Sequence, residues 1–431
     1  MTRAPDRCQS CRPLSVADLL ADLLGTDLPV AVAAYDGSHL GPRDARTTLI
    51  VRSPDALRRI VTAPGELGFG RAYVAGDLDV EGDIFDVIEL AHSVQQLRFG
   101  PKEVAAALRM VGVAGLKPLP PPPEEARLRG RRHSRERDAA AIAHHYDVSN
   151  EFYRIVLGPS LTYSCAVWSE RTPTLEQAQT DKYELICRKL ALEPGMRLLD
   201  VGCGWGGMLL HAAQHHDVRS VGVTLSRPQA DLARKRVAEL GLADRVDVRF
   251  ADFRDVDDGP YDAISSIGMF EHVGLTELDR YFRRCRDLLA PQGRMVNHGI
   301  SRPAHTRRKD HGRFAPRWLG WGFTDRYVFP DGELHEVGSV VSAMQHAGFE
   351  VRHLESLREH YARTLRCWVA NLEAAWDDAV REVGAGRARV WRLYMAAAAV
   401  GFEDDDNQVH QVLGVATVDG DSGFPLRPSF T

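Results

Sequence analysis

The sequence has few cysteines and no long hydrophobic run. Its 7 cysteines are odd in number and scattered over 431 residues, which argues against a disulfide framework and for a reducing compartment. Cys8 and Cys11 form a CxxC pair, but a closed zinc site needs four ligands and no second pair follows. Aspartates interrupt the apolar run 14–34, and no stretch approaches the roughly 20 apolar residues of a membrane span. We therefore expect a cytoplasmic protein without a bound metal, in which 14–34 forms an amphipathic helix and then a strand.

An excess of basic charge is also missing. The formal net charge is -5, so the chain has no overall positive field of the kind that nucleic-acid-binding proteins need. Hydrophobic residues (44%) and charged residues (26%) stand in the proportion of a globular protein, and 431 residues are too many for one core. We expect no nucleic-acid partner and about two or three domains.

A run of prolines divides the chain. The segment PLPPPPEE, 118–125, can neither continue a helix nor donate to a sheet, so it predicts an extended spacer. Arginines crowd the residues after it, as far as Arg137. Before the spacer, strand-like stretches (47–53 and 69–82) alternate with helix-like ones (55–63 and 84–97), which predicts a small α+β domain. The expected divisions are an N-terminal domain 1–117, a linker 118–137, a larger domain 138–413 and a disordered tail 414–431.

Strands and helices alternate regularly between 173 and 300. Thr174 and Gln177 are spaced as a capping box, so a helix is expected to begin in PTLEQAQTDKYELICRKL, 173–190. The alternation that follows predicts an α/β fold with a doubly wound, mostly parallel sheet, whose ligands bind at the carboxyl ends of the strands. Strands are expected at 197–201, 220–225, 245–250, 261–267 and 294–300, and helices at 205–216 and 226–240.

LLDVGCGWGG, 198–207, places a glycine turn between a strand and a helix. Gly202, Gly204 and Gly207 stand in GxGxxG register, which alone is a weak signal because NAD, FAD and S-adenosylmethionine (SAM) sites all use such a turn. Asp200, before the first glycine, would crowd a dinucleotide pyrophosphate but could attract the cationic methionine end of SAM. The second strand ends in SVGVTLS, without the acidic residue that an NAD ribose needs. SAM is the favoured ligand, and a purely structural glycine turn is the alternative.

Polar and aromatic residues follow the next strands at the same edge of the predicted sheet. Thr224 and Gln229 could hydrogen-bond a ribose. Asp252 and Phe253 could meet the edge and the face of an adenine. Together with the glycine turn, these residues predict a nucleoside site.

Several motifs occur together in the order found in a known family. The combination resembles the cyclopropane-fatty-acyl-phospholipid synthases; the related mycolic acid cyclopropane synthases are similar but lack a long N-terminal domain. The likeness covers about 143–411 and is weaker over the N-terminal domain. It implies a Rossmann-like SAM methyltransferase fold. The motifs are HHYDVSNEFY, LTYSCAVW, LLDVGCGWGG, GVTLSRPQ, GMFEHVG, NHGIS, RYVFPDGEL and HYARTLRCW.

The resemblance also implies a reaction, partners and site residues. A SAM methyl group is transferred to a cis double bond of an acyl chain in a membrane phospholipid, and the resulting carbocation loses a proton to a bound bicarbonate ion as the cyclopropane closes. A homodimer is implied in the same way. Beside Asp200, the residues implied for SAM are Tyr163, Ser164, the loop glycines Gly202, Gly204, Gly206 and Gly207, Thr224, Gln229, Asp252 and Phe253. Those implied for bicarbonate are Glu271, His298 and Tyr361 and, through backbone groups, Cys165 and Ile300.

The chemistry of the residues agrees with these implied roles. An alkene is a poor nucleophile, so the site must position it against the sulfonium and exclude water. A small buried anion needs donors, which backbone N–H groups, a histidine and a tyrosine hydroxyl supply. Glu271 would repel bicarbonate unless the two acids share a proton. Cys165 is not expected to act as a nucleophile, because the reaction needs no covalent intermediate.

Simpler interpretations stay open for several of these residues. Without the family pattern, His298 at the end of a strand is by default a core histidine. Tyr361 belongs to a helical apolar stripe that an ordinary core helix shows equally well. The adjacent His144 and His145 cannot easily share one metal on a helix, so no metal site is expected there.

Two basic stretches, 127–137 and 306–313, bear on where the protein acts. They are most simply solvated, yet anionic lipid headgroups attract such segments by about 1 kcal/mol per charge. We hypothesise that they dock the protein peripherally on the inner leaflet of the membrane.

The chain also departs from the family pattern. Family members often have a cysteine on the helix before GFEDDDNQVHQV, where this chain has Ala398. Close relatives quench the same cation differently and give a 10-methylene or 10-methyl branch, as in a tuberculostearic acid-type pathway; the retained Glu271 and His298 favour the cyclopropane. A non-catalytic lipid-binding homologue is the alternative from another class, and a small-molecule methyltransferase is disfavoured by the N-terminal domain.

Overall fold

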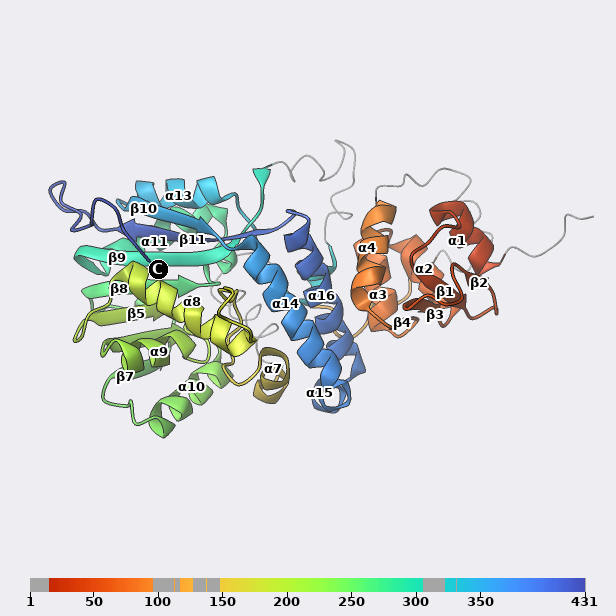
Figure 1. Ribbon diagram of the computed structural model, residues 1–431, viewed down its shortest axis with the longest axis horizontal. Helices are drawn as coiled ribbons and strands as arrows, with labels where there is room; N and C mark the ends of the chain where they lie inside the picture. Colours follow the sequence, from red (N-terminus) through yellow and green to blue (C-terminus); the bar gives the residue numbers. More distant parts are fainter. Residues whose placement is uncertain are drawn as a thin grey trace, which may run out of the picture. The chain divides into compact units, whose positions relative to one another are not determined.

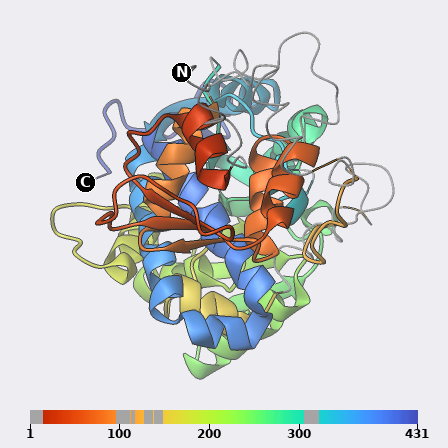
Figure 2. The same cartoon turned by 90° about the vertical axis from the view of Figure 1, so that its right-hand side faces the viewer.

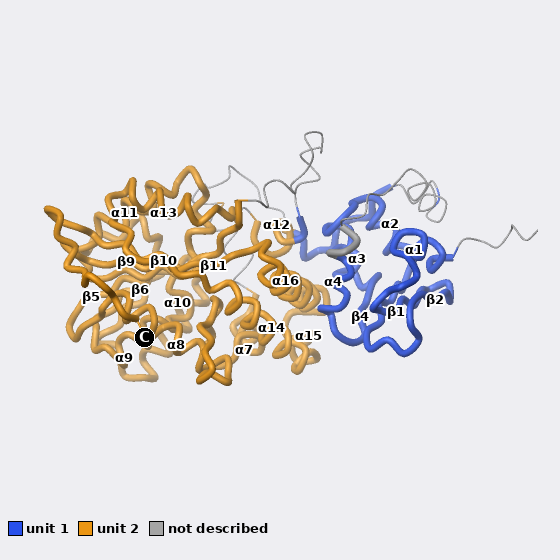
Figure 3. Tube along the Cα trace, turned by 45° about the horizontal axis from the view of Figure 1, so that its top comes forward, with its two compact units in different colours: residues 1–125, 321–323 blue, residues 126–320, 324–431 orange. Residues whose placement is uncertain are grey.

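The computed structural model describes residues 15–95, 112, 117–126, 137, 148–304, 322–330 and 332–430. They belong to two compact units, residues 1–125 with 321–323 (unit 1) and residues 126–320 with 324–431 (unit 2) (Figure 3). The expectations for Cys8 and Cys11, for His144 and His145, and for the basic stretches 127–136 and 306–313 fall outside the described residues.

Unit 1 is built on a four-stranded sheet in the order β2-β1-β3-β4, with helices beside it (Figure 2). Its first helix begins at a capping box, in which Ser15 Oγ accepts from the Asp18 N–H and the Asp18 carboxylate accepts from the Ser15 N–H. The helix and strand expected within 14–34 are confirmed. The elements are α1 (Val16–Leu24), β1 (Ala31–Ala34), β2 (His39–Leu40), β3 (Thr48–Val51), α2 (Pro54–Thr62), α3 (Glu66–Val74), β4 (Leu78–Glu81) and α4 (Ile84–Gln95).

The strand expected at 69–82 is wrong in its first half. Residues Glu66–Val74 form α3, and only Leu78–Glu81 form a strand. The apolar residues that suggested a strand are buried by a helix instead. Gly68 permits the close packing of this helix, because a β-carbon there would clash with the Ala63 carbonyl at the end of α2.

The proline segment packs on unit 1. The Arg59 guanidinium donates to the Pro120 carbonyl at 2.9 Å. Glu125 is buried and accepts two hydrogen bonds from Arg71, both at 2.8 Å. Because of these contacts the compact unit extends to residue 125, whereas the sequence suggested a domain end at 117 and a linker as far as 137.

Unit 2 is built on a seven-stranded sheet in the order β10-β11-β9-β8-β5-β6-β7 (Figure 1). The run from β9 to β7 is parallel, and β11 is antiparallel to both of its neighbours. The predicted doubly wound, mostly parallel sheet is confirmed. The strands are β5 (Arg197–Val201), β6 (Arg219–Thr224), β7 (Val246–Phe250), β8 (Tyr261–Ile267), β9 (Leu289–Ser301), β10 (Glu350–Ser356) and β11 (Gln408–Val415).

Helices cover both faces of this sheet because its strands are apolar on both sides. Leu198 packs in a core cluster with α8 and α9, whereas its neighbour Leu199 packs in a second cluster with α11 and α13, as the alternation along a strand requires. Thr174 is the N-cap of α8: its Oγ1 accepts from the Gln177 N–H, and the helix begins at the next residue. The predicted capping box is only half formed, because the Gln177 side-chain oxygen accepts from Thr174 Oγ1 and not from the Thr174 N–H. The α-helices are α7 (Asn150–Leu157), α8 (Leu175–Leu190), α9 (Gly207–His215), α10 (Arg227–Glu239), α11 (Leu278–Asp287), α13 (Val337–His346), α14 (Arg358–Ala374), α15 (Trp376–Val383) and α16 (Ala385–Glu403).

Short elements complete the chain. The 3-10 helices are η2 (Phe253–Asp255), η3 (Phe270–His272) and η4 (Leu275–Glu277), and α12 (Phe323–Tyr327) crosses the boundary of the two units. None of the helices within the described ranges is both long and apolar enough to cross a lipid bilayer.

The tail expected to be disordered is partly ordered. Gly414 and Val415 are the last residues of β11 and pair with Met295 and Arg294 of β9. Further on, Phe424 and Phe430 pack against the core cluster under α8. The apolar pattern of β11 continues to residue 415. The domain end predicted at 413 therefore falls inside this strand.

Candidate active site

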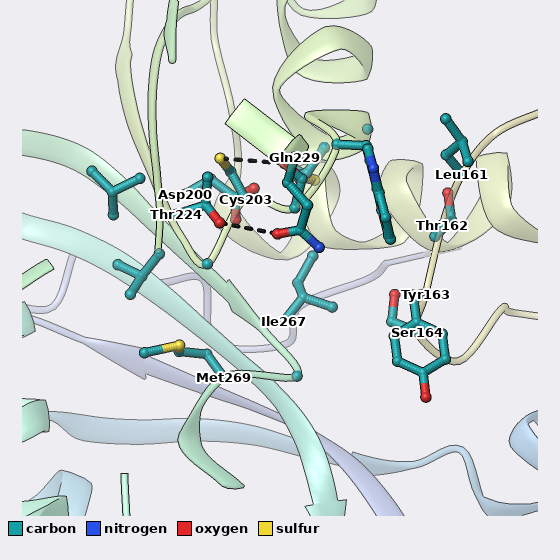
Figure 4. Close-up of a pocket in the computed structure, with 18 of the residues that line it drawn as sticks. Leu161, Thr162, Tyr163, Ser164, Asp200, Cys203, Thr224, Gln229, Ile267 and Met269 are labelled. Atoms are coloured by element: carbon teal, nitrogen blue, oxygen red, sulfur yellow. Dashed lines mark hydrogen bonds between the residues drawn. The ribbon is translucent and has the colours of Figure 1, made fainter. Parts of the chain in front are cut away.

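A pocket opens where the carboxyl ends of the parallel strands meet, near the switch point between β5 and β8. Figure 4 shows Tyr163 and Ser164 on one side of it and Asp200, Thr224 and Gln229 on the other. Of the residues expected at SAM, those that line the pocket are Tyr163, Ser164, Asp200, Gly202, Gly204, Gly207, Thr224, Gln229 and Phe253.

The glycine turn gives this pocket its shape. Gly202 and Gly204 have φ values of 80° and 54°, in the left-handed region that favours glycine. A β-carbon on Gly202 would also lie 3.3 Å from Met269 Sδ, another atom of the pocket wall. The glycine turn therefore leaves space in the pocket beside its backbone. A turn that only connected a strand to a helix would not need this space.

Two of the residues expected at SAM lie outside the pocket lining. Gly206 caps α9 with φ 82°, and its β-carbon would meet Ala233 Cβ on α10 at 3.3 Å. The Asp252 carboxylate caps η2 and pairs with the Arg254 guanidinium. In this structure, both residues support the pocket walls.

Asp200 brings a buried carboxyl to the pocket. It is 2% exposed and accepts a hydrogen bond from Ser265 Oγ at 2.7 Å. Burial raises its pKa to about 6, against the opposing effects of Ser265 and Lys182. A cationic ligand would return this pKa toward its ordinary value.

Lys182 was not expected in the site. This α8 residue is fully buried, lines the pocket and donates to Ser164 Oγ at 2.8 Å. Burial lowers its pKa to about 7, although Asp200 and Cys165 oppose the shift. The pocket therefore contains a buried carboxyl and a buried amine.

Thr224 and Gln229 are joined at the end of β6. Thr224 Oγ1 donates to Gln229 Oε1 at 3.0 Å, as Figure 4 shows. Phe253 also lines the pocket and packs edge-on against Tyr281 at 5.1 Å between ring centroids. These residues offer hydrogen-bonding groups and an aromatic face.

Glu271 lies beyond the pocket lining, in η3 after β8. Its Oε1 accepts from the Ile300 N–H at 2.7 Å, so the backbone donor of Ile300 serves this carboxyl. Its Oε2 is buried and has no hydrogen-bond partner within the described part of the chain. Burial raises the Glu271 pKa to about 7, so both protonation states are accessible near neutrality.

His298 is held in one tautomer. Lys189 Nζ can only donate, and it donates to Gln411 Oε1 at 2.7 Å. The Gln411 amide nitrogen must then donate to His298 Nδ1, at 3.1 Å. The ring proton therefore sits on Nε2, which is buried and lacks a partner among the described residues. Burial holds the His298 pKa well below its usual range, so the ring is a neutral donor.

Cys165 and Tyr361 meet at the start of α14. The Cys165 thiol donates to the Leu357 carbonyl at 3.6 Å, and the same carbonyl accepts from the Tyr361 N–H. The Leu357 N–H donates to Val409, which pairs with Ile300 across β11 and β9. A short chain of contacts thus links Cys165, Tyr361 and Ile300. Because the Ile300 N–H donates to Glu271, it also includes a fourth residue expected at the bicarbonate. Burial raises the Cys165 pKa well above its usual range, so it stays a thiol.

Comparison with known proteins assigns the family. Residues 133–412 match the family of mycolic acid cyclopropane synthetases.

The chain belongs to this family.

Three relatives cover nearly the whole chain. It is 48% identical over 429 residues to a probable fatty acid methyltransferase of Mycobacterium tuberculosis (96% of this chain, 98% of that protein). It is 33% identical over 409 residues to the tuberculostearic acid methyltransferase UfaA1 of the same organism (92% and 90%). It is 32% identical over 382 residues to the cyclopropane-fatty-acyl-phospholipid synthase of Escherichia coli (88% and 89%).

Solved structures support the fold. The structure of a mycolic acid cyclopropane synthase complexed with SAH and CTAB has a TM-score of 0.60 at 35% identity, over 64% of this chain and 98% of that one. The family resemblance and the methyltransferase fold expected from the sequence are therefore confirmed.

Three site residues of this member of the cyclopropane synthetase family were not predicted from the sequence. Lys182 stands in the helical segment TDKYEL, where an exposed lysine is ordinary. Lys189 and Gln411 are 222 residues apart, and only the insertion of β11 beside β9 brings them to His298. No local pattern could have found them.

Proposed function

We propose that the protein transfers a carbon from SAM to a cis double bond of an unsaturated acyl chain in a membrane phospholipid and closes a cyclopropane. The observation that carries this proposal is the pair of unpartnered buried atoms, Glu271 Oε2 and His298 Nε2, in a site of neutral donors. Such a pair suits a small oxyanion that takes up one proton. An ordinary small-molecule methyltransferase has no need for it.

The pocket residues fit SAM, which supplies an electrophilic methyl group when bound. Asp200 and Lys182 offer opposite charges to the ammonium and carboxylate of its amino-acid end. Thr224 and Gln229 offer hydrogen bonds to the ribose, and Phe253 offers a face to the adenine. A related cyclopropane synthase was solved with SAH, the demethylated form of SAM, which supports this ligand.

The second group of residues fits bicarbonate. His298 presents its Nε2 proton to an oxyanion, and Gln411 holds that proton in place. Glu271, with a pKa of about 7, can retain a proton and donate it to the oxyanion, which removes the repulsion expected between two carboxylates. Tyr361 and backbone groups near Cys165 complete the proposed donor set.

The test uses purified protein, SAM with a labelled methyl carbon and vesicles that contain a cis-unsaturated phospholipid. Mass spectrometry and NMR of the recovered acyl chains should show the label in a ring with shielded cyclopropyl protons. Glu271→Ala should lose this activity but still bind SAM. Unlabelled acyl chains after prolonged incubation with the intact protein would overturn the proposal and favour a non-catalytic lipid-binding role.

A 10-methylene or 10-methyl branched chain is the second candidate product. The observation that favours it is the sequence identity to the tuberculostearic acid methyltransferase (33%), which is as high as the identity to the Escherichia coli synthase (32%). The same experiment separates the two, because a methylene product shows vinylic protons and no ring protons.

Membrane docking and self-association are also proposed. The basic stretches 127–137 and 306–313 would draw the protein to anionic lipid on the inner leaflet. Vesicle sedimentation at two salt concentrations should show stronger binding to anionic than to neutral vesicles, weakened by salt. Equal, salt-independent binding would exclude this docking mode.

The proposed homodimer predicts twice the chain mass in light scattering.

A further inference from the structure

A second cluster of ligand-type side chains lies between α8 and α9, apart from the pocket. Cys187 and Glu184 stand one turn apart on α8. His211 lies on α9, and His216 caps the end of that helix. None of the four lines the SAM pocket, and the proposed reaction uses none of them.

The atoms of this cluster converge. The Cys187 Sγ and one ring nitrogen each of His211 and His216 lie within 4.8 Å of one another. Glu184 Oε2 lies 3.3 Å from His211 Nε2 and 3.0 Å from His216 Nε2. In a tetrahedral zinc site, bond lengths of about 2.0 to 2.3 Å put neighbouring ligand atoms roughly 3.3 to 3.7 Å apart. The two carboxylate–imidazole separations are therefore close to those of a zinc site. Glu184 is not in the group of ligand atoms that lie within 4.8 Å of one another, so the thiol and the carboxylate must move toward each other when a metal binds.

We propose that Glu184, Cys187, His211 and His216 form a tetrahedral site for one zinc ion or a similar divalent transition metal. One sulfur, two imidazole nitrogens and one carboxylate oxygen form a donor set that zinc accepts, and the buried thiol disfavours magnesium and calcium. Binding releases the Cys187 proton to solvent.

Both helices joined by this site also contribute to the SAM pocket. Tyr183, beside Glu184 on α8, and Gly207, at the start of α9, line the pocket. With four protein ligands the site is closed and structural, so the metal would fix α8 against α9. It would not touch the substrate.

The simpler interpretation is a polar cluster in which Glu184 pairs with two histidines beside a core cysteine. Hydrogen bonds account for the two carboxylate–imidazole distances without a metal. A metal-binding experiment distinguishes the two interpretations, because only the proposed metal site requires the Cys187 thiol as a ligand.

The test is metal binding by the full chain, in a background in which Cys8→Ser and Cys11→Ser remove the other thiol pair. After removal of metals with a chelator, the protein is titrated with Co²⁺ and with Zn²⁺. We expect one equivalent to bind, with a sulfur-to-cobalt charge-transfer absorption and a raised melting temperature. Neither SAM nor lipid is present, so this outcome does not depend on the proposed reaction.

Single variants assign the ligands. Cys187→Ala should abolish the charge-transfer band, and His216→Ala, at a half-buried helix end, should weaken binding more than about tenfold. Cys285→Ala on α11 and the exposed His346→Ala on α13 are the matched controls and should change neither. Absence of a bound equivalent, or binding that is unchanged in both Cys187→Ala and His216→Ala, would overturn the proposal. His216→Ala still answers the question if loss of the buried thiol impairs folding.

Discussion

At the scale of single residues, burial decides what Cys165 can do. Its thiol is fully buried, its pKa is raised, and it donates to the Leu357 carbonyl. Cys165→Ala should therefore retain most of its activity in the labelled-SAM assay, with Glu271→Ala as the inactive comparison. An inactive Cys165→Ala with normal folding and SAM affinity would show that the thiol takes part in the chemistry.

Gln411 would act on the proposed reaction only through His298, so it is proposed as a positioning residue. Gln411→Glu replaces the donor with a carboxylate, which should draw the ring proton to Nδ1 and leave Nε2 without a proton. We expect kcat to fall by about 10- to 100-fold with the SAM Kd unchanged. Nitrogen-15 NMR of His298 should report the exchanged tautomer; a lower kcat without that change would point to a merely structural effect. Gln408→Glu on the same strand is the control.

Glu271 should make stability depend on pH. Its pKa is raised from 4.5 to about 7, so the folded state favours the protonated carboxyl. The contribution is fully present below about pH 4.5 and is lost as the pH rises through 7. Glu271→Gln should therefore have a free energy of unfolding above that of the unchanged protein by about 3 kcal/mol at pH 8, with no difference at pH 4. Denaturant titrations measure this, and Glu239→Gln, exposed on α10, should show no such trend.

At the scale of elements, α9 approaches α8 closely at Gly207. A β-carbon there would clash with the Tyr183 hydroxyl, which hydrogen-bonds Thr162 at 2.8 Å in the pocket wall. Gly207→Ala should therefore raise the SAM Kd about tenfold, within the usual effect of overpacking. Gly338→Ala on α13, where a β-carbon has open space, should leave the Kd unchanged in calorimetry. Equal affinities for Gly207→Ala and the unchanged protein would refute the close-packing argument.

The sequence predicts elements well where one periodicity dominates. Thr174 and Gln177 locate the start of α8, and the five strands β5 to β9 of the large sheet are recognisable from their apolar residues. The sequence does not predict β10 or β11, and β10 has no fully buried residue. It fails for α3, because a short, buried apolar run fits either a helix or a strand. It cannot identify Lys182 as a site residue, because the burial of this lysine depends on packing across the fold.

At the scale of the whole molecule, the compact unit 1 ends with a buried ion pair. Arg71 and Glu125 make two hydrogen bonds of 2.8 Å with side chains 17% and 5% exposed. Glu125→Ala removes this partner from the largely buried guanidinium and should reduce local stability by about 2 kcal/mol. Hydrogen exchange of the α3 amides in the full chain measures it, with Glu124→Ala as the control. Protection unchanged in Glu125→Ala would show that the proline segment does not stabilise unit 1.

The insertion of β11 between β9 and β10 has a consequence for biosynthesis. Gln411 follows His298 by 113 residues, so a nascent chain that has reached β9 contains this histidine without the amide that fixes its proton. β9 also lacks one of its two neighbouring strands until β11 leaves the ribosome. The proposed activity is therefore expected to appear only after β11 has been made, so partly made chains should not carry out the proposed reaction.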